Sequence, residues 1–248
     1  MLHIEKKPAP GKMIREVSKI KSSPEWKMAK DGDTTAIREA FEKLTKETIR
    51  KSLLEEQHYL CAYCMRKIQN DGQKTSIEHW YPLSKDKERA LDYGNMLPVC
   101  DGGKNWVGKG KKLLCCDAYK ADEDELTISP LNKQQMDKIT YEKNGFIKTD
   151  PEDKKMNEDI RDILRLNGIW KNGKFIADTS TELLKGRKDA YLRYKRFVAK
   201  LDRDGKCTSS KIKKKIEEIE NAEQWPEYAG VLLYFLNRKY KSLVRRGL

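Results

Sequence analysis

A carboxylate and an imidazole stand side by side near the middle of this chain, between two groups of cysteines. They are Glu78 and His79, in the segment of residues 77–83. A neutral imidazole can take a proton from water near neutral pH. A carboxylate can hold a divalent ion that stabilises charge on a phosphate and its leaving oxygen. The pair therefore indicates phosphodiester hydrolysis, with His79 as general base and Glu78 as metal ligand.

Two further residues complete this candidate catalytic set. Asn95 can hold the loop between the two predicted strands, and Asp117 can supply a second metal oxygen. Hard oxygen ligands suit Mg²⁺ or Mn²⁺. A lone histidine in a strand is usually structural, but the adjacent Glu78 and the surrounding cysteines favour a chemical role for His79.

The cysteines predict a second metal site of a different kind. Cys61 and Cys64 form a Cys-x-x-Cys pair, Cys100 follows Cys64 by 36 residues, and Cys116 follows Cys100 by 16. A structural zinc site needs four ligands in a tetrahedron, and thiolates suit zinc. We expect Cys61, Cys64, Cys100 and Cys116 to hold one structural Zn²⁺.

Other uses of these residues compete with the zinc prediction. A redox role for Cys-x-x-Cys would need a preceding strand in a βαβ context, whereas a charged helix is expected before Cys61. Cys115 competes with Cys116 as the fourth ligand, because adjacent residues cannot easily point at one ion. His58 can pack at the end of its helix or replace a sulfur, and packing is favoured. Cys207 is expected to be a free thiol.

The charge balance indicates a polyanionic partner. The chain of 248 residues carries a formal net charge of +13, which attracts nucleic acid. A solvated helix face would explain clustered lysines and arginines as well. The candidate nucleic-acid-binding residues are Lys104, Lys109 and Lys111 in a glycine- and lysine-rich loop, and Arg187, Arg193 and Arg196 on a predicted helix.

Two absences in the sequence favour a cytoplasmic protein with no membrane partner. No apolar run approaches the ~20 residues of a membrane span. The first residues contain no apolar core of a signal peptide.

The pattern predicts an α+β fold, mainly helical, in three parts. Residues 1–57 form a basic arm, extended up to residue 33, and an N-terminal helix that runs from Thr34 to about Tyr59. Residues 58–130 form the core, with a strand at 76–83, a turn followed by a second strand within 94–100, and a short helix after Cys116. Residues 131–248 form a basic helical region. Its apolar spacing predicts helices around residues 156–166, 183–201, 212–219 and 231–236.

These motifs resemble the HNH endonucleases. The resemblance rests on Cys-x-x-Cys, Glu-His-x-x-Pro-Leu-Ser, Asn-x-Leu-x-x-Cys and Cys-Asp-x-x-Lys, over roughly residues 55–120. The residues around these motifs are similar to those of the PtuB branch, the nucleases of Septu and retron-associated antiphage systems. The segment of residues 164–167 is also similar to that branch.

The resemblance implies a ββα-metal core with a zinc knuckle, in which His79 matches the general base, Glu78 the acidic metal ligand, Asn95 the middle asparagine and Asp117 the final position. It also implies a DNA or RNA substrate, a PtuA-like ATPase partner, and in some systems a retron reverse transcriptase with its RNA–DNA product. The chain departs from the pattern at Asp117, where the family has His or Asn, so Asn105 is a rival for that position. It also departs at Cys115, where His is expected. A non-catalytic zinc-binding adaptor for nucleic acid or protein is the alternative function.

Overall fold

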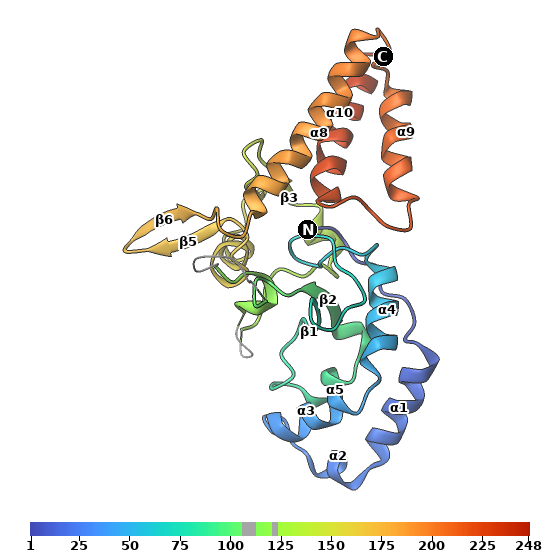
Figure 1. Cartoon of the computed structure of the whole chain (residues 1–248), viewed down its shortest axis with the longest axis vertical. Coiled ribbons are helices and arrows are strands. Elements are labelled where there is room, and N and C mark those ends of the chain that lie inside the picture. The colour runs from blue at the N-terminus through green and yellow to red at the C-terminus, as the bar shows by residue number, and fades with distance from the viewer. Residues whose placement is uncertain (106–112, 121–123) are drawn as a thin grey trace.

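The computed structural model describes residues 1–105, 113–120 and 124–248 (Figure 1). Helices dominate the described part, which also contains three two-stranded antiparallel sheets. The predicted α+β class is confirmed. The β1–β2 hairpin lies between a group of N-terminal helices and a bundle of C-terminal helices (Figure 1).

The first 33 residues are more ordered than predicted. They contain helices α1 (Gly11–Ser22) and α2 (Pro24–Met28). The predicted extended arm is wrong here because Met13 and Ile20 give α1 an apolar face that packs into a hydrophobic cluster with Trp26. Ser23 caps α2 by accepting a hydrogen bond from the Trp26 backbone amide.

The single helix predicted from Thr34 to Tyr59 is two helices, α3 (Thr34–Glu42) and α4 (Lys46–Glu56). The break at residues 43–45 is held from α1. The Glu16 carboxylate accepts hydrogen bonds from the Thr45 amide at 2.9 Å and from the Thr45 hydroxyl at 2.6 Å. The sequence pattern missed this break because the bonds come from a distant helix.

The central hairpin pairs β1 (Thr75–His79) with β2 (Met96–Cys100) in antiparallel register. Both strands were predicted. The loop between them carries α5 (Lys87–Ala90) and the single 3₁₀ turn η1 (Tyr93–Asn95). Leu97 and Val99 enter the larger hydrophobic cluster, whereas Met96 enters the N-terminal one. The alternation of side chains along β2 therefore joins the two clusters.

After β2, the chain forms η2 (Cys116–Ala118), which is one 3₁₀ turn. The short helix predicted after Cys116 is thus present as a single turn. A ββα-metal core needs a longer helix at this position, and residues 113–120 contain only this turn. The hairpin and the turn follow the order of such a core, but the complete ββα unit stays a proposal.

The C-terminal part begins with short elements. They are α6 (Lys133–Met136), β3 (Ile139–Tyr141), β4 (Ile147–Thr149), α7 (Lys154–Glu158), the π-helical turn η3 (Asp159–Ile163), β5 (Gly168–Lys171) and β6 (Lys174–Ala177). The helix predicted at 156–166 appears as α7 and η3. The two hairpins, β3–β4 and β5–β6, were not predicted.

Three long helices complete the chain: α8 (Leu183–Arg203), α9 (Ser209–Glu220) and α10 (Ala229–Arg245). All three match predicted helical segments, and they form the bundle at the top of Figure 1. Among the described residues, no helix combines the length and apolar character that a membrane crossing requires.

Candidate metal centre and catalytic cleft

Four buried cysteine sulfurs lie close together. The Sγ atoms of Cys61, Cys64, Cys100 and Cys116 all lie within 4.8 Å of one another, and Cys64 Sγ is 3.7 Å from Cys100 Sγ. Zinc–sulfur bonds of ~2.3 Å in a tetrahedron place the sulfurs ~3.8 Å apart, whereas a disulfide needs ~2.05 Å. The group therefore fits a metal ion such as zinc, and its spacing is not that of a disulfide.

Two tight backbone structures deliver these sulfurs. The first pair lies on a knuckle in which the Cys61 amide donates to the Arg66 carbonyl and the Met65 amide to the Cys61 carbonyl. Its Ala62 amide donates to the Pro98 carbonyl of β2 at 3.2 Å. The knuckle is thus fastened to the strand that ends at Cys100.

A glycine returns the fourth sulfur to the other three. Gly102 has a φ of +56°, and a Cβ atom there would lie 2.1 Å from the Cys115 carbonyl oxygen. The Cys115 amide donates to the Gly102 carbonyl at 3.0 Å. This contact brings Cys115 back against Gly102, and it places the Cys116 sulfur beside the other three. The sequence showed the glycine but not the contact that requires it.

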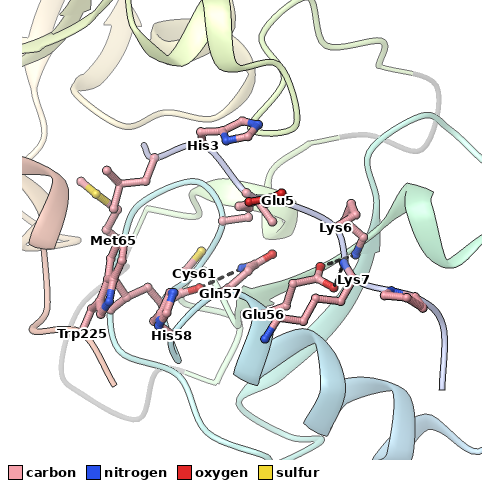
Figure 2. Close-up of a pocket in the computed structure, with 15 residues that line it drawn as sticks. His3, Glu5, Lys6, Lys7, Glu56, Gln57, His58, Cys61, Met65 and Trp225 are labelled. Atoms are coloured by element: carbon pink, nitrogen blue, oxygen red, sulfur yellow. Dashed lines mark hydrogen bonds and ion pairs between the residues drawn. The ribbon is translucent and has the colours of Figure 1, made fainter. Parts of the chain in front are cut away.

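The rival ligands are not members of this four-sulfur group, although Cys115 lies beside Cys100 and Cys116. The Cys115 thiol points to the Gly102 carbonyl oxygen, 3.7 Å away. His58 stacks on Trp225 with ring centroids 4.2 Å apart. Figure 2 shows this pair at one end of a cavity of about 490 Å³ behind the knuckle. The predicted ligand choice of Cys116, and the predicted packing role of His58, agree with this geometry.

Asn95 closes the loop that joins the two strands. Its Oδ1 accepts from the Tyr81 amide at 2.8 Å, and its Nδ2 donates to the Tyr81 carbonyl at 3.0 Å and the Arg89 carbonyl at 3.1 Å. The Trp80 amide also donates to the Asn95 carbonyl. Asn95 therefore positions the backbone directly after His79.

One ring nitrogen of His79 is engaged in a hydrogen bond to the backbone. Its Nε2 lies 3.0 Å from the Ala90 carbonyl oxygen, which can only accept, so the neutral ring carries its proton on Nε2 and its lone pair on Nδ1. Phe41 packs edge-on against the ring at 4.7 Å. Burial lowers the pKa of His79 to about 4. The imidazole is thus neutral at pH 7, the form a general base needs.

Glu78 and Asp117 form an acidic pair. Burial, and then the charge of Asp117 and a hydrogen bond to it, raise the pKa of Glu78 well above its usual value. A second carboxylate in contact with a buried one disfavours ionisation of the buried group, here Glu78. A divalent cation between them would relieve this repulsion, and carboxylate oxygens are the donors that Mg²⁺ and Mn²⁺ prefer.

Two residues that contact Glu78 were not among those predicted from the sequence. Lys120 Nζ lies 2.6 Å from Glu78 Oε1 and donates to the His79 carbonyl at 3.2 Å. The Tyr63 hydroxyl donates to the same Glu78 oxygen at 3.2 Å. The Cys-Asp-x-x-Lys spacing was the available signal for Lys120, because one turn of helix carries Asp117 and Lys120 to the same side.

A cleft of about 440 Å³ is lined by Glu78, His79, Asp117 and Lys120. Lys104 also lines it and lies 3.9 Å from the Asp117 carboxylate. The rival residue Asn105 instead donates its side-chain amide to the Gln73 carbonyl and does not line the cleft. Of the two residues considered for the final motif position, Asp117 is the one that meets Glu78.

The predicted nucleic-acid contacts divide into four groups. Lys104 lies at the cleft, and Lys109 and Lys111 lie outside the described residues. Arg193 and Arg196 are exposed on α8. Arg187 is only 1% exposed.

The surface role predicted for Arg187 is wrong, because its guanidinium lies inside the fold. It donates to the Gly145 and Leu166 carbonyls and to Asn167 Oδ1. The charge count along the helix could not separate this buried position from the exposed ones.

Comparison with known proteins gives one weak relationship. No family model matches the chain. The chain is 21% identical to the Septu protein PtuB of Bacillus thuringiensis over an alignment of 160 positions that covers 57% of this chain. The match spans 58% of the length of that relative. The chain is therefore distantly similar to a Septu protein over part of the length of each.

Proposed function

We propose that this chain is a metal-dependent nuclease of the HNH type that acts as the effector of a Septu-like antiphage complex. The observation that carries the proposal is the meeting of Glu78, His79 and Asp117 at one cleft. A neutral imidazole beside an acidic pair is the arrangement that hydrolysis of a phosphodiester needs. The similarity to a Septu protein supports the biological setting.

In the proposed reaction, His79 Nδ1 takes a proton from the attacking water. The bond from Nε2 to the Ala90 carbonyl holds the ring in the tautomer that leaves Nδ1 free to accept. Asn95 fixes the loop directly after His79, which keeps the imidazole at the cleft. The depressed pKa of His79 keeps the base unprotonated across the neutral range.

Glu78 and Asp117 would hold Mg²⁺ or Mn²⁺, which would stabilise charge on the phosphate and on the leaving oxygen. Contact with Lys120 favours the ionised form of Glu78 and partly opposes the rise in its pKa, and Lys104 adds positive charge at the cleft. The four cysteines would hold a structural zinc that fastens the knuckle, β2 and the turn bearing Asp117 to one another.

The proposed partner is a PtuA-like ATPase, since the relative is a Septu protein. A retron reverse transcriptase with its RNA–DNA product is a further proposed partner, from the resemblance of the motifs alone. Co-purification with each co-encoded protein tests both associations.

A non-catalytic adaptor is the second candidate, and the Lys120–Glu78 ion pair favours it. An ammonium at 2.6 Å already balances one carboxylate, so the pair could be structural. The adaptor would keep the zinc site and need no divalent ion at the cleft. It would bind nucleic acid or a partner protein without cutting.

The deciding experiment is incubation of the purified chain, with and without its co-encoded ATPase, with DNA and RNA in the presence of Mg²⁺ or Mn²⁺. We expect cleavage that His79→Ala abolishes while zinc content is kept. If no substrate is cut under any of these conditions, or if His79→Ala cuts at the wild-type rate, the proposal fails.

A further inference from the structure

The β5–β6 hairpin stands away from the body of the protein (Figure 1). Its strands pair from Gly168↔Ala177 to Lys171↔Lys174. Asn172 and Gly173 form the two-residue turn, with φ values of 51° and 71°, as a type I′ turn requires. Four residues per strand give an arm ~13 Å long.

This arm exposes apolar side chains that other hairpins bury. Trp170 is 52% exposed and Ile176 is 46% exposed. Trp170 and its register partner Phe175 share one face, where the Arg161 guanidinium lies 5.5 Å from the Trp170 ring. Exposed aromatic surface of this kind marks an interaction site.

The opposite face ends in two lysines directly across from each other. Lys171 and Lys174 are register partners and both are exposed. Like charges at opposite positions destabilise a strand pair, and residues 168–177 contain no acidic residue. A polyanion at the tip would remove this repulsion.

The base of the arm is fastened to the segment that carries the cleft residues. The Cys116 amide donates to the Leu164 carbonyl at 2.9 Å. The Arg165 guanidinium lies 3.1 Å from the centre of the Tyr119 ring. Tyr119 is the neighbour of Lys120, so a ligand on the arm would be held in a fixed relation to the cleft.

We infer that the β5–β6 hairpin is an arm that binds duplex DNA and presents it to the cleft. The inference rests on the proposed function in taking a nucleic acid as substrate. The major groove of B-form DNA is ~12 Å wide and admits a two-stranded β-ribbon, whereas the deep, narrow major groove of A-form RNA does not. The tip lysines would contact phosphates, and Trp170 would pack against the groove.

The test is binding of the full chain to a short duplex DNA, to the duplex RNA of the same sequence and to single strands, without added divalent ion so that nothing is cut. The variant is Lys171→Glu/Lys174→Glu, which keeps like charges opposite each other and so leaves the hairpin's own repulsion unchanged. Its control is Lys211→Glu/Lys214→Glu on α9, which makes the same change in net charge in the distant bundle (Figure 1).

We expect the tip variant to weaken duplex-DNA binding about tenfold at low salt and to reduce the log–log salt slope by about 2, one unit for each lost phosphate contact. The control variant keeps the slope. We expect Trp170→Ala to weaken DNA binding with the slope unchanged.

Several results would overturn the inference. The first is a tip variant with wild-type affinity and salt slope, and the second is a tip variant that loses as much affinity for duplex RNA as for duplex DNA. The third is a wild-type chain that binds no duplex DNA. The fourth is a tip variant that still binds DNA but no longer binds the ATPase partner. Each concerns binding alone, so the outcome does not depend on whether the chain cuts.

Discussion

The Lys120 ammonium lies 2.6 Å from Glu78 Oε1, at a place where the two side chains are only 4% and 7% exposed. A buried ion pair is costly to desolvate and gains its stability from good geometry and further hydrogen bonds, which Tyr63 and the His79 carbonyl supply. Asp117 also faces Glu78, and Lys104 lies 3.9 Å from the Asp117 carboxylate. A divalent ion would therefore bind between two carboxylates that each already have an ammonium group nearby.

We predict that Mn²⁺ raises the melting temperature of the zinc-loaded protein. A free ion concentration of 100 times the dissociation constant of the site stabilises the folded state by about 2.7 kcal/mol. Glu78→Gln and Asp117→Asn should each remove most of this shift, because each deletes one ligand. Asn105→Ala, at the rival position, should keep it. Thermal denaturation with and without Mn²⁺ measures the difference, and an equal shift in all four proteins would place the ion elsewhere.

The same pair gives a pH dependence with a definite sign. The folded pKa of Glu78 is raised above its unfolded value, so its contribution to stability is present below the unfolded pKa and is lost as pH rises through the folded pKa. A bound ion opposes this loss. We therefore expect Mn²⁺ to stabilise the protein more at pH 8 than at pH 5. Denaturant titrations at both pH values test this, and a larger effect at pH 5 would contradict it.

Gly102 should be required for zinc binding. Gly102→Ala would place a methyl group 2.1 Å from the Cys115 carbonyl oxygen, so the turn must open and Cys116 must leave the sulfur group. We expect zinc content to fall well below one per chain. Gly205→Ala is the matched control, because Gly205 has a similar φ of +62° with nothing within 4 Å of the added methyl. Elemental analysis of both variants decides whether the contact or the φ value matters.

The fourth zinc ligand can be tested directly. We predict that Cys116→Ser loses the ion and that Cys115→Ser keeps it, because the Cys115 thiol points to the Gly102 carbonyl. Loss of a structural zinc removes folding free energy on the order of 10 kcal/mol. Cys207→Ser, outside the cluster, is the control. The opposite result for Cys115 and Cys116 would exchange their roles.

The sequence was sufficient where the chemistry is local. Residues close to one another in the chain predict strands β1 and β2. They also predict the Cys-x-x-Cys pair and the position of His79 before the loop that Asn95 holds. The three long C-terminal helices follow from apolar spacing. Each of these features is set by side-chain periodicity or by ligand type, which a sequence states directly.

The features that were missed depend on contacts between distant residues. The break between α3 and α4 needs Glu16, and the burial of Arg187 needs carbonyls from residues 145 and 166. Arg187, Arg193 and Arg196 on the predicted helix could not be told apart from the sequence. Only the packing of α8 shows that Arg187 faces inward while Arg193 and Arg196 face out.

His79→Ala is the variant that separates a catalytic base from a structural histidine. Loss of a positioned base costs about 10²–10⁴ in rate, so we expect cleavage to fall by that amount while zinc is kept. Because the folded pKa of His79 is lowered to about 4 from 6.5, wild-type stability from this group is present above pH 6.5 and is lost as pH falls toward 4, by on the order of 3 kcal/mol. Without the imidazole, His79→Ala should not show this part of the loss of folding stability at low pH. His79→Gln, which keeps a polar group near the Ala90 carbonyl, should fold better yet remain inactive. If activity in both variants falls only in proportion to the folded fraction, His79 is structural and the base lies elsewhere.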